Sequence, residues 1–376
     1  MKIVIVSTAY PLRGGIAHYV YLLYKHLSNR HQVSVVTFKR QYPKILFPGK
    51  SQEEKSGEGF IIPSVALMDS VNPLTWIKTG KYVASLLPNL VIFKYWIPFF
   101  APLFGTVARI SKKLSGCKVL FICDNVVPHE GTPVDRFLTK WAFKPVDFFI
   151  VQSKSVEKDL LALMRNPVYR NVPHPVYEIF GESISRKVAR KELGFNENEK
   201  VALFFGFIRA YKGLKVLLEA MPVVLKNVNL KLLVVGEFYE DPKPYIDFIK
   251  EHGLVGNVIL IDKYVPNRDV ALYFSAADLV VLPYVSATQS GIVQIAYNFG
   301  IPVIVTDVGG LSEVVTNGVS GYVVEPNSPI TLADAIVKFY SNDNAARLKR
   351  GAQMQKEKYS WENLVKAIES FVQDFS

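Results

Sequence analysis

The chain has 376 residues, of which 49% are hydrophobic, 12% aromatic and 20% charged. That length favours two domains over one, and the composition excludes a disordered, low-complexity or short-repeat protein. Residues 1–175 hold 23 Lys and Arg against 10 Asp and Glu, whereas residues 176–376 hold 21 against 23. The resulting net charges of +13 and −2 indicate that the two halves meet different partners.

Short apolar runs, each followed by a turn and an amphipathic segment, recur along the first half of the chain. This alternation is typical of βα units that build a parallel sheet. The predicted strands are residues 2–6, 32–38, 118–123 and 147–151. The first of them is too short and too weakly charged in front for a signal peptide, so we expect a cytoplasmic protein.

Two further features of the first half bear on its surroundings. Residues 86–105 are the most apolar stretch, but Lys94 and three prolines interrupt it, whereas a membrane span needs ~20 largely uninterrupted apolar residues. Cys117 and Cys123 flank one predicted strand, which makes a disulfide framework implausible. The sequence therefore predicts that residues 86–105 form no transmembrane helix. It also predicts that both cysteines are reduced thiols.

The second half repeats the pattern after a segment that is rich in proline. Its predicted strands are residues 201–205, 231–235, 258–261, 279–282, 303–306 and 322–324. Three prolines crowd residues 166–180, where no period is visible, and mark a domain boundary. We predict an α/β protein with two doubly wound, Rossmann-like domains, residues 1–170 and 171–355, and a helix within 356–376 that packs back on the first domain.

The loop after the first predicted strand is a candidate ligand site. In open parallel sheets, ligands bind beyond the carboxyl ends of the strands, so two such edges facing each other would place a site in a central cleft. Gly14 and Gly15 stand at the start of a predicted helix. Adjacent glycines let the backbone approach a phosphate or sugar closely, and the first turn of a helix offers free N–H donors. A tight turn without a ligand is the alternative interpretation.

The loop after the first strand of the second half carries two cations. Residues 206–213 read GFIRAYKG, with Arg209 and Lys212 directly before a helix. Cations fixed at such a position stabilise the negative charge that grows on a departing nucleotide diphosphate, without a metal. Ordinary surface charges on a solvated loop are the alternative.

Short sequence elements follow one another in a specific order through almost the whole chain. They are GGI at 14–16, GFIRAYKG at 206–213, Gly236, Ala277-Asp278 with Pro283, GIPV at 300–303, GG at 309–310 with Glu313, and GVSG at 318–321. In order and spacing they resemble the family-four (group 1) retaining glycosyltransferases of GT-B fold. The resemblance is strongest over residues 201–324.

The resemblance implies where substrates bind. The second domain would bind a nucleotide diphosphate sugar and the first a saccharide or lipid-linked acceptor. The sequence leaves UDP- and GDP-sugars both open as donors, and we prefer UDP. His129 matches the family's cleft histidine and is assigned a catalytic role with Arg209 and Lys212. The alternative is a structural role, because a lone histidine is usually structural and an aromatic residue beside a valine more often belongs to the core. The donor contacts implied outside the glycine pair at 14–15 include Gly206, Gly236, Tyr264 and Val265.

One departure from the family concerns a pair of glutamates seven residues apart. Thr288 and Ala296, or Ala287 and Ile295, stand at the two possible alignments, so no carboxylate is carried over. Residues 289–291 read QSG, which is similar to a variant in one branch of the family. A helix cap is the alternative role for Ser290. The donor contacts assigned to this loop are Thr288, Gln289, Ser290 and Gly291.

The sequence predicts catalysis without a metal or cofactor. No Asp-x-Asp sequence occurs, which removes the usual metal clamp of the other large glycosyltransferase fold. The family implies a front-face displacement, in which the acceptor hydroxyl attacks from the side of the leaving group and a departing phosphate oxygen takes its proton. Anomeric configuration is then retained.

Three other classes of protein are the alternatives to a glycosyltransferase. A nucleotide-sugar epimerase or hydrolase of the same fold would need an acid/base pair at the anomeric carbon, and no strong candidate pair is visible. A dinucleotide oxidoreductase would carry Gly-x-Gly-x-x-Gly after the first strand, which residues 9–17 do not. A non-catalytic sugar-nucleotide binding module stays open, because fold does not fix function.

The basic first half predicts an anionic acceptor or surface. Residues 94–100 read KYWIPFF, and Arg109, Lys112 and Lys113 follow closely. This mixture suits lipid headgroups, and no nucleic-acid-binding motif occurs. We therefore expect peripheral association with an anionic membrane at its inner face and a role in polysaccharide or glycolipid biosynthesis. Core packing of the aromatic residues is the alternative.

Overall fold

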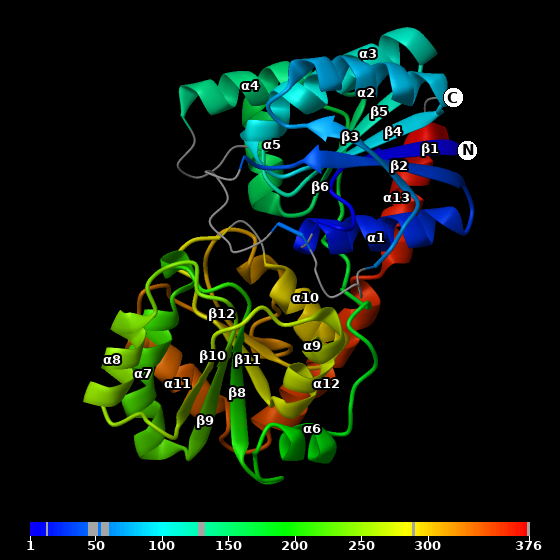
Figure 1. Ribbon diagram of the computed structural model, residues 1–376. Helices are drawn as coiled ribbons and strands as arrows, with labels where there is room; N and C mark the ends of the chain where they lie inside the picture. Colours follow the sequence, from blue (N-terminus) through cyan, green and yellow to red (C-terminus); the bar gives the residue numbers. More distant parts are fainter. Residues whose placement is uncertain (13, 44–51, 54–59, 127–131, 288–289, 374–376) are drawn as a thin grey trace. The chain divides into compact units, whose positions relative to one another are not determined.

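The computed structural model describes residues 1–12, 14–43, 52–53, 60–126, 132–287 and 290–373 (Figure 1). The chain forms two compact units, the first comprising Met1–Pro175 and Trp361–Ser376 and the second Val176–Ser360. Both divisions fall five residues after the predicted positions 170 and 355. The chain passes between the units twice, after Pro175 and after Ser360. Within the second unit, the amide of Val176 donates to the carbonyl of Tyr359 at 2.9 Å, so the two segments lie side by side there.

The first unit is built on a seven-stranded parallel sheet in the order β3-β2-β1-β4-β5-β6-β7. Its strands are β1 (Lys2–Val6), β2 (Gln32–Arg40), β3 (Ser64–Asp69), β4 (Leu90–Tyr95), β5 (Lys118–Cys123), β6 (Phe148–Val151) and β7 (Tyr169–Asn171). The sequence analysis does not predict β3, β4 or β7. Every residue of β4 is buried, which explains the continuous apolar run in place of an alternating pattern.

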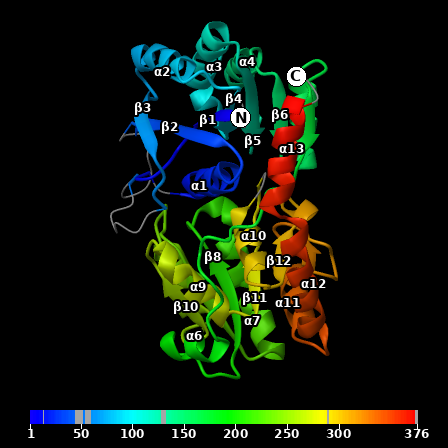
Figure 2. The ribbon, with the colours of Figure 1, turned by 90° about the vertical axis from the view of Figure 1, so that its right-hand side faces the viewer.

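Helices cover both faces of this sheet (Figures 1 and 2). They are α1 (Gly15–Ser28), α2 (Pro73–Ser85), α3 (Ala101–Ser115), α4 (Pro133–Phe143), α5 (Lys154–Leu163) and α13 (Trp361–Gln373), with a short 3-10 helix η2 (Pro98–Phe100). The starts of α2 and α4 are specified locally. Asn72 accepts a hydrogen bond from the Leu74 amide, and Thr132 and Asp135 form a capping box.

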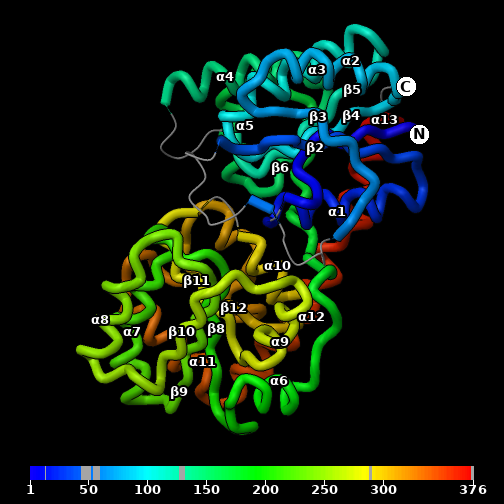
Figure 3. The backbone as a smooth tube through the Cα atoms, viewed as in Figure 1, coloured from blue at the N-terminus to red at the C-terminus, as the bar shows by residue number. Residues whose placement is uncertain are grey.

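The last helix, α13, belongs to the first unit, although the chain passes through the second unit before reaching it (Figure 3). Trp361 stacks on His26 with the ring centroids 5.5 Å apart, and Phe371 stacks on Phe148 at 4.9 Å. The Arg30 guanidinium donates to the Glu362 carboxylate at 2.8 Å. Aromatic packing and an ion pair therefore join α13 to the first unit.

The second unit contains a six-stranded parallel sheet in the order β10-β9-β8-β11-β12-β13. Its strands are β8 (Lys200–Phe205), β9 (Leu230–Val235), β10 (Val258–Ile261), β11 (Leu279–Leu282), β12 (Val303–Thr306) and β13 (Gly321–Val324). Its helices are α6 (Arg186–Glu192), α7 (Leu214–Asn227), α8 (Lys243–Glu251), α9 (Asn267–Ala276), α10 (Gly291–Asn298), α11 (Pro329–Phe339) and α12 (Asn344–Lys358), with 3-10 helices η3 (Ala210–Lys212) and η4 (Ser312–Val314). All six predicted strands of this half are confirmed to within one residue. Both units are doubly wound α/β structures, as predicted.

Candidate functional site

The order of strands in the second unit reverses between β8 and β11, and ligands of open α/β sheets bind at such a point. The loops that follow these two strands touch. Gly213 has a φ of +69°, and a Cβ atom placed on it would lie 1.9 Å from the carbonyl oxygen of Pro283. Only glycine fits there, so the predicted cationic loop is held against the loop after β11.

Two further glycines bring the loops after β8 and β9 together. A Cβ atom on Gly236 would lie 2.0 Å from the carbonyl oxygen of Gly206, so the loops after β8 and β9 approach closely. A Cβ atom on Gly206 would lie 3.1 Å from the Lys212 Nζ atom. Any side chain at Gly206 would therefore crowd the ammonium group.

The ammonium group of Lys212 is buried and has no counterion in the described part of the chain. The residue is 9% exposed, and among the described residues its Nζ atom makes no hydrogen bond or ion pair; the ring of Tyr284 lies 5.6 Å away. Burial, and secondarily the charge of Arg209, lowers the pKa of Lys212 to about 8. A buried cation without a partner is unfavourable in the empty protein and favours an anionic ligand.

The pKa of Lys212 predicts how activity depends on pH. In the ligand-free protein this group is protonated below about pH 8 and loses its proton as the pH rises through that value. If the ammonium stabilises the donor diphosphate, kcat/KM falls about tenfold per pH unit above it. In the Lys212→Arg variant the fall should be absent, because a guanidinium stays protonated. A wild-type profile that stays flat to pH 10 would exclude this role for Lys212.

Aromatic side chains from three successive loops gather beside Arg209. Its guanidinium lies 4.9 Å from the ring centroid of Tyr239, and Phe207 lies 4.5 Å from Tyr239 and 6.3 Å from Tyr264. Of the predicted base contacts, Tyr264 joins this cluster, whereas the side chain of Val265 is buried in the core, as the alternative interpretation had it. The sequence analysis assigned no role to Phe207 or Tyr239, although each closely follows a glycine at a strand end.

The described end of the loop after β11 is a helix start. Ser290 caps α10 by accepting a hydrogen bond from the Ile292 amide at 3.3 Å, and its hydroxyl lies 3.2 Å from that of Tyr284. A Cβ atom on Gly291 would lie 2.8 Å from Cε2 of Tyr177. Ser290 therefore has the capping role that the sequence left as an alternative, beside the ring that faces Lys212. The predicted contacts Thr288 and Gln289 lie outside the described residues.

In the first unit the strand order reverses between β1 and β4, and the predicted glycine loop follows β1. Gly14 is the N-cap of α1, with a φ of +114°, and no heavy atom lies within 4 Å of the position its Cβ would take. The hydroxyls of Ser7 and Thr8 are buried there and have no hydrogen-bond partner among the described residues. Gly15 is the first residue of α1. The loop thus has both open space and unsatisfied polar atoms.

A buried polar cluster that the sequence analysis missed lies at the carboxyl ends of β4, β5 and β6. The Lys94 ammonium donates to Asp124 at 2.5 Å and to Gln152 at 2.7 Å, and it lies 3.7 Å from the ring centroid of Tyr19. Burial lowers the pKa of Lys94, and the Asp124 carboxylate opposes that shift. Burial, with the charge of Lys94, lowers the pKa of His174 to about 4, so His174 is neutral at pH 7.

This cluster corrects the predicted lipid-binding surface. Lys94 is fully buried, Phe100 is buried, and Trp96 packs partly buried against the same core, so the segment 94–100 is internal. Core packing, the alternative interpretation, is right for these residues. Of the cations that follow, Arg109 lies 3.7 Å from the Trp141 ring and Lys112 pairs with an aspartate.

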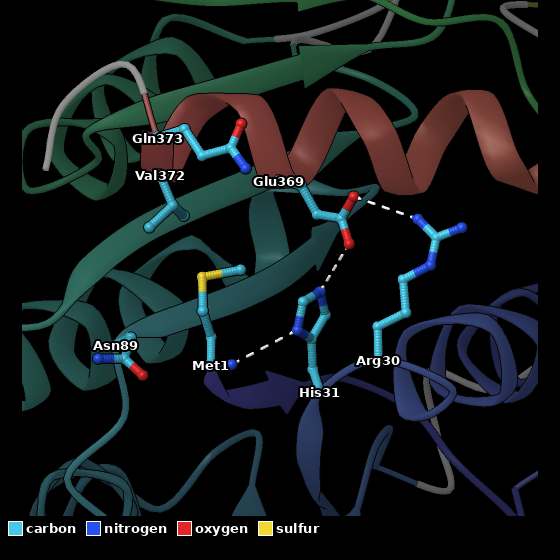
Figure 4. Close-up of a pocket in the computed structure, with 7 residues that line it drawn as sticks. All are labelled: Met1, Arg30, His31, Asn89, Glu369, Val372 and Gln373. Atoms are coloured by element: carbon cyan, nitrogen blue, oxygen red, sulfur yellow. Dashed lines mark hydrogen bonds and ion pairs between the residues drawn. The ribbon is translucent and has the colours of Figure 1, made fainter.

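A hollow of about 550 Å³ opens at the amino ends of the strands of the first unit (Figure 4). The carboxylate of Glu369 on α13 accepts from His31 at 2.9 Å and from Arg30 at 3.3 Å. The amino group of Met1 lies 3.5 Å from the other ring nitrogen of His31. These groups satisfy one another and fasten α13 to the unit, so the hollow does not compete with the carboxyl edges as a ligand site.

Two properties of the described residues bear on the predictions about metals and membranes. Within them, no three His, Cys, Asp or Glu side chains are grouped so that they could hold a metal ion. None of the helices described has the length and apolar character that crossing a bilayer requires. His129 falls in the segment 127–131, outside the described residues.

Known proteins resemble this chain in sequence and in fold. Residues 185–361 match the family model described as "Glycosyl transferases group 1". An uncharacterized glycosyltransferase of Methanocaldococcus jannaschii is 25% identical over 97% of this chain and 96% of its own length. The D-inositol 3-phosphate glycosyltransferase of Corynebacterium urealyticum is 32% identical, over 48% of this chain and 44% of that protein.

Solved structures share the fold at low sequence identity. HepE from Anabaena, solved with UDP-glucose, has a TM-score of 0.76 at 18% identity and covers 100% of both chains. Sucrose-phosphate synthase from Thermosynechococcus elongatus has a TM-score of 0.76 at 19% identity, covering 100% of this chain and 99% of that one. The fold is that of the GT-B glycosyltransferases, and the comparisons support a glycosyltransferase of group 1.

Proposed function

We propose that this protein is a retaining glycosyltransferase that moves a sugar from a UDP-sugar to a saccharide or lipid-linked acceptor. The observation that carries the proposal is the buried ammonium of Lys212, without a counterion among the described residues, at the strand-order reversal of the second unit. A nucleotide diphosphate supplies the missing negative charge. Arg209 adds a second cation close enough to depress the pKa of Lys212.

The proposed reaction is a front-face displacement. The acceptor oxygen forms a bond to the anomeric carbon while the bond from that carbon to the diphosphate breaks, and a departing phosphate oxygen takes the hydroxyl proton. Arg209 and Lys212 stabilise the charge that develops on the diphosphate. Backbone N–H groups at Gly14, Gly15 and Gly291 contribute contacts to donor or acceptor. His129 is the remaining catalytic residue of the proposal.

The preference for UDP over GDP is part of the proposal. The cluster of Phe207, Tyr239 and Tyr264 offers aromatic faces beside Arg209, on which a base can stack. This supports a base near Tyr264, whichever base it is. HepE, which has the same fold, was solved with UDP and with UDP-glucose, and this supports uridine as the nucleoside.

The chain also departs from the family's paired glutamates. At the alternative positions, the described residues Ala287, Ile295 and Ala296 are all apolar. We propose that the chain belongs to the branch with Gln-Ser-Gly at 289–291, and that ribose is held by groups other than these carboxylates. Both cysteines are buried free thiols, which supports action in a reducing cytoplasm.

A thermal-shift panel tests the donor site. A ligand that binds only the folded state stabilises it, by about 2.7 kcal/mol at a hundred times Kd. At equal concentration the tighter ligand raises Tm more, so UDP and UDP-sugars should raise Tm more than GDP does. The Lys212→Met variant should lose most of the shift. If no nucleoside diphosphate raises Tm, the proposed donor site is wrong.

Product analysis tests the reaction itself. Transfer from the accepted donor should give a product with the donor's anomeric configuration by NMR, and EDTA should leave the rate nearly unchanged, since two cations neutralise the leaving group. An inverted product or strict dependence on Mn²⁺ or Mg²⁺ contradicts the mechanism. Donor hydrolysis or epimerisation without transfer would identify an epimerase or hydrolase of this fold, and binding without turnover a non-catalytic module.

A further inference from the structure

The helices α2, α3 and α4 form a continuous outer layer on one face of the sheet of the first unit (Figures 1 and 2). The middle helix, α3, contacts both of its neighbours. On the opposite face of the sheet lie α1 and α13. The outward surface of the layer therefore combines side chains from three separate segments of the sequence.

This layer is strongly basic. Asp135 is the only acidic residue within α2, α3 and α4, and its carboxylate already accepts hydrogen bonds from the amide and hydroxyl of Thr132. Several exposed cations of the layer make no ion pair with any described residue. They are Lys78, Lys81, Lys113, Arg136, Lys140 and, at the C-cap of α4, Lys144.

Large apolar side chains lie exposed among these cations. Leu74 is 76% exposed and Ile77 is 42% exposed; they lie two turns and one turn before Lys81, respectively, along the same stripe of α2. On α4, Phe137 is 69% exposed and precedes Lys140 by three residues. Leucine, isoleucine and phenylalanine side chains interleaved with unpaired cations are costly to leave in water, and they match a bilayer surface with anionic headgroups.

We propose that the α2–α3–α4 layer is a docking surface for an anionic lipid bilayer. The cations meet the headgroup phosphates, and the apolar side chains enter the boundary between headgroups and acyl chains. Nucleic acid fits this surface less well, because a phosphate backbone offers nothing to Leu74 and Ile77. The surface replaces the internal segment 94–100 as the membrane contact. It stands independently of the proposed transfer reaction.

Flotation of the full chain with vesicles tests this surface. The protein should float with vesicles of phosphatidylcholine and phosphatidylglycerol at low salt, and less as salt is added, because exposed charges are screened. It should not float with phosphatidylcholine alone. The variant Lys78→Glu with Lys81→Glu should lower vesicle affinity by at least about 25-fold, at about fivefold per lost charge. The variant Leu74→Ser with Phe137→Ser should also lose binding.

Matched variants on the second unit control for net charge and for exposed apolar area. Lys243→Glu with Lys250→Glu changes the charge by the same amount on exposed positions of α8, and Ile330→Ser removes an apolar side chain that is 69% exposed, as Phe137 is. These variants should float like the wild type. The proposal is overturned if the wild type does not float, if the α2 variant floats equally well, or if binding to neutral vesicles is as strong. Flotation needs neither donor nor acceptor, so its failure differs from a failed transfer assay.

Discussion

Lys212→Met is expected to lower kcat/KM by about 30- to 1,000-fold, or about 2–4 kcal/mol of transition-state stabilisation. The substitution keeps most of the side-chain volume and removes only the charge that faces the proposed diphosphate. Arg209→Ala should lower kcat/KM in the same direction. Steady-state kinetics with saturating acceptor and varied donor measures both effects.

The same Lys212→Met substitution should raise the stability of the ligand-free protein at pH 7. A depression of the Lys212 pKa from 10.5 to about 8 corresponds to about 3 kcal/mol of unfavourable burial of the charged form. Between these two pH values the unfolded chain binds more protons than the folded one, so wild-type stability rises with pH across that window. Loss of activity together with a higher Tm is not expected from a merely structural lysine.

Lys215→Met is the matched control for this prediction. Lys215 lies three residues further along, at the start of α7, is highly exposed and pairs with Glu219. Its substitution should leave both kcat/KM and Tm near their wild-type values. Equal losses of activity in the Lys212 and Lys215 variants would show that general positive charge, and not the buried ammonium, serves the donor.

Lys94→Met is expected to destabilise the first unit by about 3 kcal/mol, because it leaves the Asp124 carboxylate and a buried oxygen of Gln152 without their donor. For a unit of this size the loss corresponds to a Tm lower by roughly 6–12 °C. Circular dichroism or calorimetry measures the change. The expected result follows from the burial of Lys94, since an exposed lysine contributes within about 0.5 kcal/mol.

A second substitution distinguishes the pair from simple packing. Adding Asp124→Asn to Lys94→Met removes the uncompensated negative charge and should recover part of the lost stability. If Lys94→Met alone leaves Tm unchanged, Lys94 is not the buried ion-pair partner that the structure shows. If the double variant is as unstable as the single one, packing and not charge dominates at this position.

The strands of the second unit could be predicted from sequence because each is a short apolar run bounded by turn residues. In the first unit, β4 escaped prediction because its apolar run continues past the end of the strand into η2 and α3, so no clear turn bounds it. The edge strands β3 and β7 were missed because partly exposed edge positions carry a weak apolar signal. The sequence pattern thus predicts a strand where turn residues bound a short apolar run at both ends.

The sequence alone determined the cationic loop of the proposed donor site, since Gly206, Arg209 and Lys212 stand in one short loop between a strand and a helix. Tertiary structure decided what that loop faces and which cations are accessible. Lys94, for example, donates hydrogen bonds to Asp124 and Gln152, which are 30 and 58 residues away along the chain. The exposed basic layer likewise combines three helices. Such contacts depend on strand order and helix packing, which join distant segments and leave no local pattern from which they could be read.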